Sequence, residues 1–183
     1  MPNRLARSTC VTAAAACLFA ATPAAASDKD WATASDITRD ALVLAALGVP
    51  IAKGDKDGTF QAAGSLAVTA GTSYVLKSTI DEQRPDLSGN DSFPSGHTSV
   101  SFAAAATLQK RYGWKVGLPA HLAAGFVGVA RVEAHKHYWK DVIAGAAIGE
   151  VAGMLITRKH DSNVQVFPWA ASDGGGVVLA ARF

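Results

Sequence analysis

A series of helix-length segments, several of them rich in alanine and glycine, constrains the fold more than any other feature of this sequence. The segments span residues 37–52, 60–78, 97–113, 116–132 and 138–157, and polar connections or chain breakers separate them. Small side chains allow neighbouring helices to approach closely. The sequence therefore predicts an all-α protein, a compact helical bundle of about five to six helices.

Local signals set the expected helix boundaries. Residues 27–36 are polar and are expected to form an arm, with Asp36 as the cap of the first helix. Residues 53–59 are expected to form a solvated turn, because they lack the full ligand spacing of a calcium loop. Gly113 is suited to end the third helix, and Pro119 is suited to the first turn of the fourth.

The C-terminal residues 161–183 have a different pattern. Two segments rich in β-forming residues flank the sequence SDGG at residues 172–175. This arrangement predicts a short C-terminal β-hairpin that follows the helical domain, residues 27–160.

The N-terminal residues 1–26 resemble a secretory signal peptide. Arg4 and Arg7 precede an apolar run, and three alanines stand directly before Ser27. Cleavage would place the mature protein in the periplasm or cell envelope, and the alternative is an uncleaved anchor helix.

Charge and cysteine content narrow the possible functions. The formal net charge is +2, and Arg4 and Arg7 leave with the leader, so the mature chain has no broad basic field for nucleic acid. Both cysteines, Cys10 and Cys17, also lie in the leader. The mature chain therefore offers neither a thiol nucleophile nor a cysteine metal site.

Membrane placement stays open at this stage. Residues 59–76 carry no charge and reach the lower length of a membrane span. Several hydroxyl side chains and glycines in this segment favour a helix buried between other helices. We expect a periplasmic protein with possible contact to a membrane surface, and an integral inner-membrane protein is the alternative.

Three clusters of polar residues stand at the ends of the expected helices. His137 and Asp141 are four residues apart, so on a helix the carboxylate can orient the imidazole and leave one ring nitrogen free. The clusters are Lys77 with Arg84 and Pro85; Pro94, Ser95, Gly96 and His97; and Arg131, His137 and Asp141.

In a bundle with alternating helix directions, all of these ends face the same side. Three cations and two imidazoles then share one rim, which is costly unless an anion neutralises them. Phosphate is suited to this role, because arginine binds it bidentately and amides at the start of a helix point toward it.

The spacing of the three clusters, from Lys77 to Asp141, resembles the three-part signature of the type 2 phosphatidic acid phosphatase and vanadium haloperoxidase superfamily. The resemblance implies that His137 is the nucleophile, that Asp141 orients it, and that His97 is the acid and base. It also implies a phosphate-binding set of Lys77, Arg84, Ser95, Gly96 and Arg131, with no metal ion. One position differs, because Ala130 stands where the family often has serine before the arginine.

The expected function is a metal-independent phosphatase that hydrolyses phosphate monoesters, either lipid phosphates or small soluble ones, through a phosphohistidine. The alternatives are a vanadium-dependent haloperoxidase and a non-enzymatic helical protein of the envelope. No cofactor is expected for the phosphatase, whereas vanadate would be an inhibitor, or the cofactor in the haloperoxidase. His121 and His135 fall outside the signature and are expected to be a packing residue and a surface residue.

Overall fold

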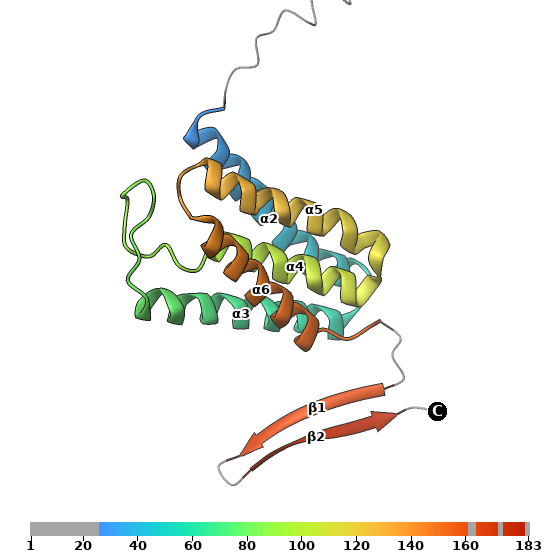
Figure 1. The fold of residues 1–183 in the computed structure, drawn as a ribbon. Helices are drawn as coiled ribbons and strands as arrows, with labels where there is room; N and C mark the ends of the chain where they lie inside the picture. Colours follow the sequence, from blue (N-terminus) through green and yellow to red (C-terminus); the bar gives the residue numbers. More distant parts are fainter. Residues whose placement is uncertain (1–25, 161–163, 172–173, 182–183) are drawn as a thin grey trace, which may run out of the picture.

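The structure, a computed structural model, describes residues 26–160, 164–171 and 174–181. Its elements are α2 (Asp28–Ala52), α3 (Lys56–Thr79), α4 (Gly96–Tyr112), α5 (Trp114–Glu133) and α6 (Trp139–Ile156), followed by β1 (Val164–Ala171) and β2 (Gly174–Ala181) (Figure 1). The all-α bundle with a short C-terminal hairpin is confirmed. The expected signal peptide falls almost entirely on residues 1–25, which lie outside the described residues.

Helix α2 begins nine residues earlier than expected, at Asp28 rather than at residue 37. Ser27 caps it, because the Ser27 side chain accepts a hydrogen bond from the Asp30 amide at 3.3 Å and the Asp30 carboxylate accepts one from the Ser27 amide at 2.9 Å. The prediction of a polar arm capped by Asp36 was therefore wrong. Asp36 instead lies inside α2, at the end of the bundle where His97 and Arg131 also lie.

Helix α3 also starts earlier, inside the expected turn. Asp55 is its N-cap and accepts a hydrogen bond from the Gly58 amide at 3.0 Å. Asp55 further accepts hydrogen bonds from Arg111 Nε at 2.7 Å and from the Tyr112 hydroxyl at 2.9 Å. Only a short segment is left for the turn, because this buried carboxylate ties the start of α3 to the end of α4.

Helix α4 is the centre of the bundle and packs against each of the other four helices (Figure 1). Its residues Ala103, Ala104, Ala105 and Ala106 are completely buried. Side chains this small on all sides of a helix allow four neighbours to surround it.

The closest packing joins α4 to α6 through glycines spaced four residues apart on α6. A Cβ atom built on Gly149 would lie 2.1 Å from the Ser99 carbonyl oxygen, and one on Gly145 would lie 2.6 Å from the Ser95 carbonyl oxygen. Gly153 continues the row, where a Cβ atom would lie 2.5 Å from Ala106 Cβ. The two backbones therefore touch along a row without side chains, as small residues permit.

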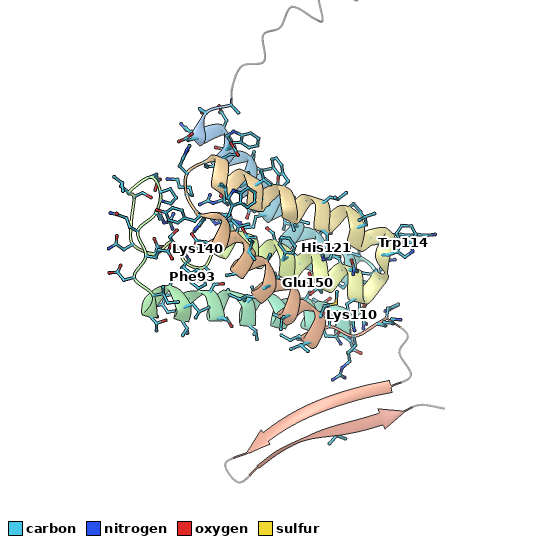
Figure 2. All side chains as sticks on the ribbon, viewed as in Figure 1. Phe93, Lys110, Trp114, His121, Lys140 and Glu150 are labelled. Carbon is cyan, nitrogen blue, oxygen red and sulfur yellow. The ribbon has the colours of Figure 1, made fainter. Side chains whose placement is uncertain are left out.

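The alternating helix directions place the C-terminal ends of α3 and α5 beside the N-terminal ends of α4 and α6, as expected (Figure 1). The connection from Ile80 to Ser95 runs along the same end of the bundle. Phe93 and Lys140 mark this end in Figure 2, and Lys110 and Trp114 mark the opposite end. The three motif clusters are thus brought to one end.

Two further features complete the fold. In the hairpin, β1 and β2 pair antiparallel, with Val164 opposite Ala181 and Ala171 opposite Gly174. Within the described part of the chain, no helix combines the length and the apolar character that crossing a membrane requires.

We expect the substitution Gly149→Ala to destabilise the protein by about 1–3 kcal/mol, because the added methyl group would collide with backbone rather than with a flexible side chain. Gly71→Ala in α3 is the matched control, since no atom lies within 4 Å of a Cβ built there. The control should leave the stability unchanged or raise it by up to about 1 kcal/mol. Urea unfolding followed by circular dichroism measures both, and equal stability of the two variants would contradict the close packing of α4 and α6.

Candidate active site

The His137 imidazole and the Asp141 carboxylate form a buried pair where α6 begins. Their exposed fractions are 2% and 0%, and His137 Nδ1 lies 3.6 Å from Asp141 Oδ2. The same Oδ2 accepts hydrogen bonds from the Ser92 hydroxyl at 2.5 Å and from the Tyr138 amide at 2.9 Å. The carboxylate is therefore fixed from two sides. Because Nδ1 faces it, Nε2 lies on the opposite edge of the imidazole ring.

Burial lowers the pKa of the His137 imidazole from its ordinary 6.5 to about 3. The positive charges of Lys77, Arg131 and Arg84 also contribute to this low pKa, and the negative charge of Asp141 opposes them. His137 is consequently neutral at physiological pH. A neutral imidazole whose Nδ1–H faces a carboxylate has a free lone pair on Nε2, as a nucleophile requires.

Arg131 lies at the end of α5 and is 5% exposed. Its Nη1 atom donates a hydrogen bond to the Ser35 hydroxyl at 3.4 Å and lies 3.6 Å from Asp36 Oδ1. A backbone hydrogen bond also links Arg131 to the pair of His137 and Asp141, because the His137 amide donates to the Arg131 carbonyl at 3.3 Å. Burial lowers the pKa of the guanidinium group, which nevertheless stays protonated because an arginine pKa is so high.

Lys77 and Arg84 are the other two cations whose charges act on His137. Arg84 binds the Asp91 carboxylate with two hydrogen bonds, from Nε at 2.9 Å and from Nη2 at 3.0 Å. Lys77 Nζ lies 3.9 Å from Asp91 Oδ2 and also donates to the backbone carbonyls of Asp91 and Ser92. Burial is the main cause that lowers the pKa of Lys77. Both cations are thus positioned by the segment that carries Asp91 and Ser92.

Ser95 and Gly96 form the start of α4. The Ser95 amide donates to the Asp141 carbonyl at 3.0 Å, and the Ser95 and Thr98 hydroxyls share a hydrogen bond of 2.9 Å. Ser95 therefore fastens α4 to α6 at the site. A Cβ atom on Gly96 would lie 3.8 Å from Lys77 Cε, so the first amides of α4 lie beside that cation. Amides in the first turn have no partner within their own helix and are suited to bind an anion.

His97 follows in the first turn of α4. Its Nε2 atom lies 2.7 Å from Asp36 Oδ1, and the Arg39 guanidinium contacts the same nitrogen. Burial lowers the pKa of His97 to about 4, and the positive charges of Arg131 and Arg39 act in the same direction. Asp36 raises this pKa and so opposes them.

The eight residues proposed from the sequence thus lie around one end of the bundle: His137, His97, Asp141, Lys77, Arg84, Ser95, Gly96 and Arg131. The other three histidines, His121, His135 and His160, do not belong to this set, as expected for His121 and His135. His135 is exposed and pairs with Asp28 at 3.0 Å. His121 Nε2 lies 3.0 Å from Glu150 Oε2, and both side chains are visible between α5 and α6 in Figure 2.

Sequence reasoning missed five residues that hold the site residues in place: Ser35, Asp36, Arg39, Asp91 and Ser92. For the three on α2, one signal was available. Ser27 and Asp30 form a capping pattern that places the start of α2 before them. For Asp91 and Ser92, which lie in an irregular connection, no periodic signal exists.

Comparison with known proteins identifies the family of this bundle. Residues 58–165 match the family model described as the PAP2 superfamily, and this match covers more than half of the chain. The chain therefore belongs to the PAP2 superfamily.

Curated relatives are named as phosphatases of lipids. A lipid A 1-phosphatase of Porphyromonas gingivalis is 32% identical over 93 residues, which cover 49% of this chain and 21% of the relative. Lipid phosphate phosphatase 1 of Arabidopsis thaliana is 38% identical over 89 residues, which cover 41% of this chain and 27% of the relative. A lipid A 4'-phosphatase of Helicobacter pylori is 29% identical over 140 residues, which cover 70% of this chain and 71% of the relative. The matched segments thus span only a fifth to about a quarter of the first two relatives.

Two crystal structures share the fold. LpxE of Aquifex aeolicus superimposes with a TM-score of 0.61 at 21% identity, over 70% of this chain and 84% of that one. A transmembrane PAP2-type phosphatidylglycerolphosphate phosphatase from Bacillus subtilis gives a TM-score of 0.52 at 21% identity, over 82% and 86%. The helical bundle is therefore the fold of solved PAP2 proteins.

We expect the substitution Lys77→Met to raise the pKa of His137 by about one unit, because it removes a nearby positive charge that disfavours the imidazolium ion. Imidazole chemical shifts followed by NMR during a pH titration measure this change. Lys110→Met at the opposite end of the bundle is the control and should leave the His137 titration unchanged. An unchanged pKa in Lys77→Met would mean that this cation does not face His137.

Proposed function

We propose that the protein is a metal-independent phosphatase that hydrolyses phosphate monoesters through a phosphohistidine intermediate. The observation that carries the proposal is a neutral, buried His137 that faces Asp141 on one edge and has three cations around it. A nucleophile of this kind requires an anionic substrate, and the cations provide the charge that binds one.

In the first step, His137 Nε2 attacks phosphorus and the bond from phosphorus to the ester oxygen breaks. His97 gives its proton to the leaving oxygen, so that an alcohol departs. Asp141 stabilises the positive charge that forms on the His137 ring. Lys77, Arg84 and Arg131 stabilise the negative charge on the phosphoryl oxygens as the transition state forms.

In the second step, His97 takes a proton from water as the water oxygen bonds to phosphorus. The bond from His137 Nε2 to phosphorus breaks, which releases inorganic phosphate and restores both imidazoles. The three cations supply the charge stabilisation that a metal ion provides in other phosphatases. Activity should therefore persist in the presence of a chelator.

Lipid phosphates are the substrate class that we favour. The relatives are named as phosphatases of lipid A and of other lipid phosphates. Large apolar or aromatic side chains are exposed where α6 begins, next to the site: the N-cap Tyr138 is 43% exposed, Trp139 54% and Ile143 66%. Aromatic residues of this kind favour the interface between water and lipid, so this end of the bundle is suited to contact a membrane surface.

The cell envelope is the compartment that agrees with this substrate. The support is the secretory pattern of residues 1–26, which would carry the bundle to the periplasm. Detection of the N-terminal residue of the protein isolated from an envelope fraction tests the cleavage before Ser27.

We expect His137→Ala to lower the rate of phosphate release from a lipid phosphate by at least about 10³-fold, because the variant lacks the nucleophile. His135→Asn is the matched control, since His135 is an exposed histidine two residues away with a φ of 52°, which asparagine tolerates. Malachite green detection of phosphate gives the rates, and circular dichroism checks the helical content. Turnover by His137→Ala at the wild-type rate would refute the mechanism.

We expect vanadate to inhibit phosphate release competitively, because it imitates the phosphoryl group in its transition state and would bind the same cations. The same vanadate-treated protein, supplied with peroxide and bromide, should not oxidise bromide. Halide oxidation in the absence of phosphatase activity would instead identify a haloperoxidase, and the absence of both activities would favour a non-enzymatic envelope protein.

A further inference from the structure

We propose that Asp36 of α2 is a positioning residue for His97, which it holds through Nε2 so that Nδ1 is the nitrogen that exchanges a proton with the substrate. The proposal rests on the phosphatase reaction described above and assigns a role to a residue outside the three motif clusters.

The contact between the two side chains is short and joins distant parts of the chain. Asp36 Oδ1 lies 2.7 Å from His97 Nε2. The two residues belong to α2 and α4, so only the packing of these helices brings them together. Because Asp36 lies inside the helix rather than at its cap, its direction is fixed by the helical backbone.

The Oδ1 atom faces inward, although the Asp36 side chain as a whole is 48% exposed. This oxygen is buried and has no hydrogen bond of standard geometry, although it lies 2.7 Å from His97 Nε2, 3.6 Å from Arg131 Nη1 and 3.9 Å from Arg39 Nη1. A surface carboxylate with no role would turn both oxygens to water. Here one oxygen is directed at the imidazole and at two guanidinium groups.

These neighbours explain why His97 needs a carboxylate. The charged groups that face it among the described residues are Arg131 of α5 and Arg39 and Asp36 of α2. Two cations disfavour a protonated imidazole, yet an acid must carry a proton before it can give one away. The negative charge of Asp36 offsets the cations, and without it the pKa of His97 would be still lower.

Arg39 provides a second partner for the same nitrogen. Asp40 fixes its guanidinium group, with distances of 3.0 Å to Nε and 2.8 Å to Nη2, and the Nη1 atom then contacts His97 Nε2. A carboxylate accepts a hydrogen bond from a protonated Nε2. A guanidinium group has no acceptor, so it can only donate a hydrogen bond to an unprotonated Nε2. The carboxylate therefore favours the ring form that carries a proton on Nε2.

This assignment determines which proton moves. With Nε2–H retained and held by Asp36, the imidazolium loses the Nδ1 proton to the leaving oxygen as the bond from phosphorus to that oxygen breaks. Nδ1 then accepts a proton from the attacking water, and the ring regains its charge. The site would thus contain two pairs of an imidazole and a carboxylate, His137 with Asp141 and His97 with Asp36, one for the nucleophile and one for the acid and base.

The test compares Asp36→Asn with Asp36→Glu and with the control Asp57→Asn, an exposed carboxylate in the first turn of α3 at the opposite end of the bundle. The kcat of each variant is measured on an aryl phosphate with an acidic leaving group and on an alkyl phosphate with a basic one. Loss of an acid harms the alkyl ester most, because its leaving oxygen needs the proton.

We expect Asp36→Asn to lower kcat on the alkyl ester by about 10²-fold and on the aryl ester by about tenfold or less. Asp36→Glu should recover part of the loss on the alkyl ester, and Asp57→Asn should remain within about threefold of the wild type on both. Equal losses on both esters in Asp36→Asn, or the same losses in Asp57→Asn, would overturn the proposal.

A second measurement does not depend on activity. NMR titration should show that Asp36→Asn lowers the pKa of His97 by about one unit or more, while Asp57→Asn leaves it near the wild-type value. An unchanged His97 titration in Asp36→Asn would refute the coupling even in an active enzyme. A lowered pKa in a protein without phosphatase activity would refute the proposed function and leave the contact between Asp36 and His97 intact.

Discussion

The direct contact between the backbones of α4 and α6 is the constraint on which the site depends. Gly145 and Gly149 leave no space between the helices, and the Ser95 amide can therefore donate to the Asp141 carbonyl at 3.0 Å. This bond joins the first turn of α4, which carries His97, to the first turn of α6, which carries Asp141. A side chain between the helices would separate the two imidazoles that the proposed reaction uses together.

Charge is distributed unevenly over the helical bundle. Most of the bundle is held by small apolar side chains, and the cations of the site collect at one end, where burial and mutual repulsion lower the pKa values of both imidazoles. Carboxylates limit the cost, because Asp91 binds Arg84 and Asp36 lies close to Arg131 and His97. A cluster of cations of this kind is suited to bind a dianionic phosphate ester.

Much of the fold and of the candidate site could be predicted from the sequence. Helix-length segments rich in small residues led to the all-α bundle, and helix ends that carry Lys77, His97, Arg131 and His137 led to a shared rim. The extra length of α2 was missed because the polar residues before Asp36 resemble an arm, although Ser27 and Asp30 cap a helix there. Membership of the PAP2 superfamily agrees with the resemblance noted in the three motif clusters.

The sequence by itself determined which groups are candidates for the reaction. Arg131, His137 and Asp141 lie in one short segment, so their spacing along the chain sets much of their local geometry. Only the tertiary structure decided which groups hold them. Ser92 reaches Asp141 and Asp36 reaches His97 across separations of 49 and 61 residues, and such contacts depend on how helices pack rather than on any local pattern. Covalent spacing fixes neighbours along a helix, whereas packing selects neighbours between helices.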